Sequence, residues 1–183
     1  MATLRKAGAY SKKYTRPNTR ISKKKSKAFI KTVPQLKVVK FNIGKKEKYD
    51  SGEFDTELSI ISLEKIQIRD NAIESARQFL NRKLEKAMPG NFYLEIRVFP
   101  HHILRENKMI TGAGADRMQS GMKHSFGRVA GRAAILTPGK DIFLIATNGD
   151  KNMRIVKANL TSIKSKLPCK TQILVKKTAK PRP

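Results

Sequence analysis

Residues that carry most metal chemistry are few in this sequence and do not form a complete ligand set. The histidines are His101, His102 and His124, and their presence could suggest a metal site. Adjacent histidines point in different directions, however, and no cluster of cysteines or carboxylates completes the ligands. We therefore expect these imidazoles to make phosphate contacts or local hydrogen bonds, and we expect no bound metal.

The single cysteine, Cys169, has no obvious partner base that would activate it as a nucleophile. It follows Pro168 at the start of an apolar segment, a position typical of a small buried hydrophobic residue. One cysteine also cannot form an internal disulfide, which agrees with a reducing compartment.

Two further enzymatic interpretations fail on spacing. The pattern Gly112-x-Gly114 is too short for a dinucleotide fingerprint, lacks the third glycine and follows a loop instead of a strand. The 14 acidic residues are scattered mainly over residues 47–95, without the clustered carboxylates that a nuclease would need. We expect no catalytic residue, no cofactor and no small-molecule substrate.

The most informative segment is a long loop, residues 108–122, without an apolar pattern of its own. Residues 111–115 are all small, so the backbone there is flexible and can approach a ligand closely. Such loops are usually functional or disordered, and we expect this one to be flexible when free and ordered against RNA. The candidate contacts in and beside the loop are Arg105, Lys108, Gly112, Gly114, Arg117, Lys123 and His124.

Residues 1–27 form a basic arm that contains ten Lys/Arg and no acid. Lysines and arginines can neutralise phosphates, while interspersed tyrosine rings can stack on unpaired bases. The arm's candidate RNA contacts are Arg5, Lys6, Tyr10, Lys12, Lys13, Tyr14, Arg16 and Arg20. A solvated polybasic tail or a targeting signal is the alternative. Residues 176–183 repeat the basic pattern as a shorter tail.

A second basic patch follows the loop. Strand alternation would place Arg128, Ala130 and Arg132 on one face, with Val129 and its alternate neighbours on the other. We interpret Arg128 and Arg132 as phosphate contacts, with a solvated strand face as the alternative.

The overall charge points to a polyanionic partner. The chain carries a formal net charge of +26 over 183 residues, far more than solubility requires. The longest uncharged apolar stretches, such as residues 142–146, are strand-sized, whereas a spanning helix needs roughly 20 residues. The N-terminal residues also lack the apolar core of a secretory signal. We therefore expect a cytoplasmic protein without a membrane partner.

Apolar periodicity predicts a mixed α+β chain. Strands are expected over residues 38–44, 58–68 with a phase shift near Ile61, 92–98, 129–136, 142–146 and 171–175. Helices are expected after Asp70, through residue 87, and after Asp150, ending before Pro168. The turn signal Pro138-Gly139 predicts a hairpin between the strands beside it.

These elements predict one domain, residues 28–175, in which two helices pack on a largely antiparallel sheet. Basic N- and C-terminal extensions and the long flexible loop lie outside the core of this domain. The length allows a single domain with a modest apolar core.

Three segments carry a family resemblance. They are Phe99-Pro-His-His-Ile-Leu-Arg-Glu-Asn-Lys108, Thr111-Gly-Ala-Gly-Ala-Asp-Arg-Met-Gln-Ser-Gly-Met122 and Phe126-Gly-Arg-Val-Ala-Gly131. Together they resemble the universal large-subunit family called L sixteen in bacteria, in its archaeal and eukaryotic branch called L ten-e. The segment from Lys166 to Thr171 also fits, and the resemblance covers about residues 1–175. The run Lys23-Lys24-Lys25 and the basic tail depart from the family pattern.

The resemblance implies an α/β-hammerhead fold and a structural role on 23S-type rRNA in the large ribosomal subunit. It implies a loop that reaches toward the peptidyl transferase centre and the acceptor end of tRNA, in support of translation. Expected partners are 23S-type rRNA, 5S rRNA, tRNA and neighbouring large-subunit proteins. A free DNA-binding architectural protein, which would use the same charge without the loop, is the alternative from another class.

Overall fold

The computed structural model describes residue 8, residues 32–106 and residues 128–177 of the chain. The elements follow one another as β1 (Asn42–Gly44), α2 (Lys46–Asp50), β2 (Thr56–Ser62), β3 (Ile66–Arg69), α3 (Asp70–Ala87), β4 (Phe92–Ile96), β5 (His102–Glu106), β6 (Arg128–Leu136), β7 (Asp141–Thr147), α5 (Asp150–Ile163), the 3-10 helix η2 (Lys164–Lys166) and β8 (Thr171–Lys177). This order of helices and antiparallel strands confirms the predicted α+β class.

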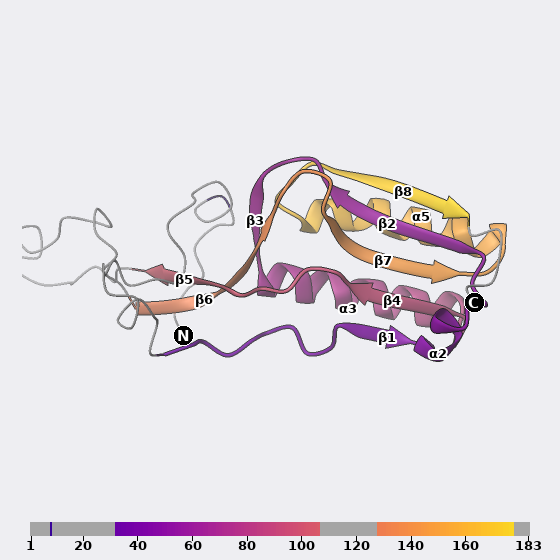
Figure 1. The fold of residues 1–183 in the computed structure, drawn as a ribbon, viewed down its shortest axis with the longest axis horizontal. Helices are drawn as coiled ribbons and strands as arrows, with labels where there is room; N and C mark the ends of the chain where they lie inside the picture. Colours follow the sequence, from indigo (N-terminus) through magenta and orange to yellow (C-terminus); the bar gives the residue numbers. More distant parts are fainter. Residues whose placement is uncertain (1–7, 9–31, 107–127, 178–183) are drawn as a thin grey trace, which may run out of the picture.

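The strands form two sheets instead of the single sheet that was expected. A five-stranded sheet has the order β1-β4-β7-β2-β8, and a three-stranded sheet has the order β3-β6-β5. Every pairing in both sheets is antiparallel. In Figure 1, α3 and α5 lie behind the larger sheet, and β5 and β6 extend beyond the helices at one end.

The helix α3 forms where apolar residues recur at helical spacing. Ile73, Ala76, Leu80 and Leu84 are fully buried, so one side of the helix packs on the sheets. The helix ends before Gly90, whose φ of +69° is a conformation that glycine adopts readily. Asp70 is the first residue of the helix and not its cap, because the cap position is Arg69, in extended conformation.

The two faces of the larger sheet bury different clusters. Phe92, Leu94, Phe143 and Ile145 belong to the main core shared with α3 and α5. The alternate residues Tyr93, Leu144 and Ala146 form a smaller cluster with Phe54, and Tyr49 of α2 packs on it. The Tyr49 and Tyr93 rings stack with centroids 4.6 Å apart. Burial is the main cause that raises the pKa of Tyr93 to about 12. The short helix α2 therefore covers the sheet face opposite α3 and α5.

The predicted hairpin at Pro138-Gly139 is wrong, although the turn itself is present. Gly139 has a φ of +83°, but β6 pairs with β3 and β5, whereas β7 pairs with β2 and β4. The turn instead docks on the end of β2, where Gly139 N donates to Ser62 O at 2.8 Å and Ser62 N donates to Lys140 O at 3.0 Å. The residues of the turn determine that the chain reverses its direction. The pairing with distant strands determines that β6 and β7 belong to different sheets.

The expected strand region 58–68 is divided in a similar way. The register of β2 against β7 shifts between Ile60 and Ile61, which confirms the predicted phase shift. The chain then leaves the larger sheet after Ser62 and enters the smaller one at Ile66. The strand β5 and the helix α2 were not predicted, because neither segment shows a clear apolar period.

Candidate nucleic-acid interface

The strands β5 and β6 form the base of the candidate RNA loop. Their register pairs His102 with Ala133 and runs to Glu106 and Arg128, the residues that end β5 and begin β6. The loop contacts predicted from the sequence, from Lys108 to His124, lie outside the described residues. The structure therefore fixes the two points from which the loop leaves the body, at the end where β5 and β6 extend (Figure 1).

Residues 32–41 connect to the basic arm, and two carboxylates of α3 hold this segment in place. Asp70 Oδ2 accepts a hydrogen bond from Lys37 N at 3.3 Å, and Glu74 Oε2 accepts one from Val39 N at 3.4 Å. The two carboxylates lie one helical turn apart, so they match backbone N–H groups two residues apart in an extended chain. Val38, between the two donors, is buried in the main core.

Glu74 also accepts hydrogen bonds from Arg77, with Nε at 2.8 Å and Nη2 at 2.5 Å. Both side chains are 11% exposed. The hydrogen bond from Arg77 holds the pKa of Glu74 below its usual value, and the same bond raises the pKa of Arg77. Glu74 therefore stays ionised at neutral pH and can accept all of its donors.

Arg132 joins the segment 32–41, which connects to the arm, to β6, which forms one side of the base of the loop. Its Nε donates to the carbonyl oxygen of Pro34 at 2.7 Å, across 98 residues of sequence. Arg132 was predicted to face phosphate, and the structure shows that part of its guanidinium bonds to the protein's own backbone. The arm and the loop consequently leave the body close together. The arm residues predicted as RNA contacts lie outside the described residues.

Arg128 and Arg132 were expected on one strand face through unbroken alternation. The register of β5 against β6 shifts between Leu104 and Arg105, where the pairing passes from Gly131 to Val129, so the alternation along β6 is interrupted between Arg128 and Arg132. The expectation of a shared face consequently loses its basis. The side chains of Arg105 and Arg128 lie outside the described part of the structure.

The adjacent histidines differ in environment. His101 is exposed, and its Nδ1 lies 3.0 Å from Phe99 O, which is the expected local hydrogen bond. His102 is 1% exposed, and neither ring nitrogen has a hydrogen-bond partner among the described residues, contrary to the expectation for this imidazole. Burial, with a smaller contribution from His101, lowers the pKa of His102 to about 4. His102 is therefore neutral at physiological pH and supplies no charge for phosphate.

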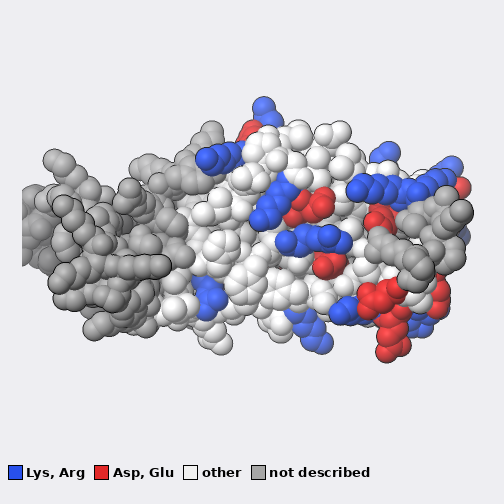
Figure 2. All heavy atoms as spheres, in the orientation of Figure 1, with Lys and Arg blue, Asp and Glu red and all other residues white. Residues whose placement is uncertain are grey.

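Acidic side chains gather at the end of the body opposite the loop and arm bases. Figure 2, which shows the sheet face in front of α3 and α5, has most of its red atoms near α2. In that region Lys48 pairs with Glu53 at 2.8 Å, and this bond lowers the pKa of Glu53. Exposed lysines, among them Lys45 and Lys46, lie in the same region, so acidic and basic side chains are mixed at this end of the body.

Other candidate sites remain weak in the part of the chain that the structure describes. No group of three His, Cys, Asp or Glu residues there could hold a metal ion. No helix there is long and apolar enough to cross a membrane. Cys169 is half-buried against the main core, and burial raises the pKa of its thiol. It packs as the predicted small hydrophobic residue.

Sequence reasoning missed the contacts that place the arm base. Asp70 was interpreted as a helix cap, and Glu74 and Pro34 were not singled out. The only sequence signal was a pair of acids spaced four apart on the side of α3 that bears buried residues. Such acids require partners when buried, but their identity depends on the tertiary fold.

Comparison with known proteins agrees with this arrangement. A family model described as Ribosomal protein L16p/L10e matches residues 17–174. A protein of Thermofilum pendens is 40% identical over 173 residues, which cover 94% of this chain and 96% of the relative. A protein of Archaeoglobus fulgidus is 37% identical and covers 94% of each chain. Both relatives are named Large ribosomal subunit protein uL16.

The chain belongs to this ribosomal protein family. The resemblance seen in the sequence is thereby confirmed, and the archaeal relatives agree with the expected branch. A further relative from Caldivirga maquilingensis is 37% identical and covers 97% of this chain and 98% of its own. The family consists of structural ribosomal proteins and not of enzymes, as the scattered carboxylates had indicated.

Proposed function

We propose that this protein is a structural constituent of the large ribosomal subunit, where it binds 23S-type rRNA and supports translation in the cytoplasm. The observation that carries the proposal is the family match over residues 17–174, with relatives named as large-subunit proteins. The net charge of +26 supports it, because a chain of this charge needs a polyanion to neutralise it.

In this proposal the loop and the arm approach RNA from the same end of the body. The support is the Arg132–Pro34 hydrogen bond, which holds the two bases together, and the pairing of β5 with β6, which gives the loop a rigid base. The loop then reaches toward the peptidyl transferase centre and the acceptor end of tRNA. Arg105, Lys108, Arg117, Lys123 and His124 are its proposed polar contacts, and Gly112 and Gly114 allow close approach of the backbone.

The arm contributes phosphate contacts through its lysines and arginines and stacking through Tyr10 and Tyr14. Further proposed partners are 5S rRNA and neighbouring large-subunit proteins. Peptide-bond chemistry remains with RNA, because the protein contributes positioning groups only. The α/β-hammerhead arrangement that the resemblance implies remains a prediction.

Sucrose-gradient sedimentation of a cell lysate, followed by immunoblotting, tests the proposal at moderate and at high salt. We expect the protein to sediment with the large subunit and with polysomes at both salt concentrations. Recovery with DNA, or as free protein at the top of the gradient, would contradict the proposal and favour the architectural alternative.

A further inference from the structure

The strand β8 forms a free edge of the five-stranded sheet. It comes last in the strand order, and among the described strands it pairs with β2 alone. Figure 1 shows it at the outer margin of the molecule. All seven of its residues pair with β2 without a shift in register, whereas the pairings of β2 with β7 and of β5 with β6 are interrupted. The edge is therefore long and lacks the bulge that often protects such strands.

The hydrogen bonds at the end of β2 establish which backbone groups of β8 point away from the sheet. On the β7 side, Ser62 N donates to Lys140 O at 3.0 Å. On the β8 side, Leu63 N donates to Lys170 O at 3.0 Å. In an antiparallel ladder, pairs that exchange hydrogen bonds alternate with pairs that do not. Continued along the register, this alternation turns the N–H and C=O groups of every second β8 residue away from β2. These residues are Thr171, Ile173, Val175 and Lys177.

The outward side of β8 combines these backbone groups with apolar side chains. Within the described residues, no backbone hydrogen bond is made to this side of the strand. Ile173 packs on the main core, and the side chain of Val175 is 41% exposed. An extended chain that pairs with the edge therefore gains ladder hydrogen bonds and covers an exposed apolar side chain at the same time.

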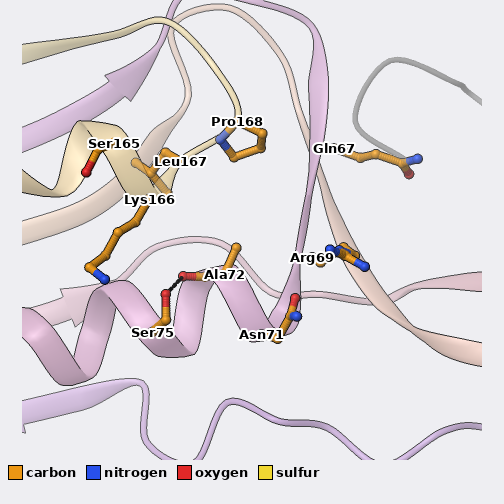
Figure 3. Close-up of a pocket in the computed structure, with 9 residues that line it drawn as sticks. All are labelled: Gln67, Arg69, Asn71, Ala72, Ser75, Ser165, Lys166, Leu167 and Pro168. Carbon is orange, nitrogen blue, oxygen red and sulfur yellow. Dashed lines mark hydrogen bonds between the residues drawn. The ribbon is translucent and has the colours of Figure 1, made fainter. Parts of the chain in front are cut away.

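The edge is held in place before any partner binds. Leu167, which lies in the connection from η2 to β8, belongs to the main core. Figure 3 shows Leu167 and Pro168 of this connection beside α3, at a hollow of about 340 Å³. Because β8 is fixed both before its start and along β2, a partner strand meets a preformed template, which lowers the entropic cost of binding.

The charge of β8 indicates which class of partner fits the edge. Residues 171–175 contain no charged side chain. Lys176 lies directly opposite Glu57 of β2. Lys177 Nζ lies 3.1 Å from Asp150 Oδ1. Both lysines of the strand are thus next to acids of the body, in a chain whose net charge is +26. A neutral, apolar edge suits an extended protein segment, whereas nucleic acid requires free cations for its phosphates.

We infer that β8 is a docking edge, at which an extended segment of a neighbouring large-subunit protein adds a further strand to the sheet. The inference rests on the proposed function, and it names the surface through which one such neighbour binds. The segment that fits is uncharged and rich in β-branched residues, because its side chains then pack beside Val175 on the core side and Leu174 on the other side.

The first test identifies the neighbour of the edge in purified large subunits. A benzophenone-bearing amino acid takes the place of Val175 in the full chain, and subunits that contain this chain are irradiated. We expect a cross-linked product that resists ribonuclease, in which mass spectrometry identifies an uncharged peptide of another subunit protein. The same probe in place of Phe99, which is 49% exposed in the connection between β4 and β5, is the control and should not cross-link to that peptide.

The second test removes one outward N–H group. Val175→Pro deletes the donor but leaves the ladder with β2 in place, because this N–H does not point toward β2. Val175→Thr keeps both the N–H and the β-branched shape, so it is the matched control. Each variant is expressed beside the unmodified chain, and mass spectrometry measures the ratio of the two chains in large subunits after a high-salt wash. Val175→Pro should be depleted about tenfold, whereas Val175→Thr should stay at the level of the unmodified chain.

Binding of the isolated chains to large-subunit rRNA separates this inference from the proposed function. If the unmodified chain does not bind rRNA, the proposed function fails and the docking edge fails with it. If it binds, but the probe at Val175 cross-links to rRNA, to a second copy of this chain or to nothing, the docking edge is overturned while the ribosomal role stands. Undiminished incorporation of Val175→Pro also overturns the docking edge. Circular dichroism melting shows whether Val175→Pro folds, and if it does not, the cross-linking result decides alone.

Discussion

Burial of His102 predicts a loss of stability at acidic pH. This imidazole is 1% exposed in β5, and its folded-state pKa is about 4, whereas an unfolded histidine titrates near 6.5. As pH falls below about 6.5, the unfolded chain therefore binds a proton that the folded chain does not bind until about pH 4. The contribution of neutral His102 to stability is complete above pH 6.5 and is lost progressively between pH 6.5 and pH 4.

The size of the effect follows from the two pKa values. A difference of about 2.5 units corresponds to roughly 3 kcal/mol when both states are fully protonated, and about 2 kcal/mol of this is lost by pH 5. In the variant His102→Leu the site cannot titrate. Its free energy of unfolding, relative to the unmodified chain, should rise by about 2 kcal/mol when pH is lowered from 8 to 5.

Urea denaturation of both chains at pH 8 and pH 5 measures this difference, because the other titrating groups contribute equally and cancel. The exposed neighbour supplies a matched control, because His101→Gln removes an imidazole but keeps the buried His102, so the loss of stability that His102 causes at acidic pH should persist. If the relative stability of His102→Leu changes by less than about 0.5 kcal/mol between the two pH values, the imidazole is not held neutral in the fold.

Three further predictions address the arm base, a turn and the loop. Glu74→Gln should lower the free energy of unfolding by about 3 kcal/mol in thermal melts, because Arg77 keeps a nearly buried charge without its carboxylate. A loss below 1 kcal/mol would contradict the proposed importance of this pair. Gly44→Ala should cost about 3 kcal/mol in urea denaturation, because φ is +92° and the new Cβ would overlap a carbonyl oxygen. Gly139→Ala, with φ of +83° and open space, should cost about 1 kcal/mol, and equal costs would refute the steric argument. Arg117→Ala should weaken tRNA binding by assembled subunits about tenfold in filter binding, and unchanged affinity would remove tRNA positioning from the loop's proposed role.

The helices could be predicted from the sequence because their signal is local. The spacing of Ile73, Leu80 and Leu84 defines one side of α3, and that side is the one buried in the core. The prediction for α5 placed its start just after Asp150 as a cap, whereas Asp150 is the first helical residue and Gly149 is the cap, and the last turn became the 3-10 helix η2. Neighbouring residues are enough to determine such an element, because its hydrogen bonds join residues four apart.

The candidate interface was predicted in outline from composition and motif. The loop motif led to the ribosomal family, and the net charge indicated a polyanionic partner before any element was placed. The loop and arm contacts themselves remain predictions, because their residues lie outside the described part of the structure.

By itself, the sequence determined the α+β class, the two long helices, the shift in β2 and the family. Only the tertiary structure decided that β6 and β7 part into different sheets and that Arg132 reaches Pro34. It also decided that Lys166 Nζ lies 5.5 Å from the centroid of the Phe79 ring. These features join residues far apart in the chain, and no local pattern specifies which distant partner satisfies a strand edge, a buried carboxylate or a cation. That choice is made when the whole core packs, because many weak long-range contacts must then be satisfied together.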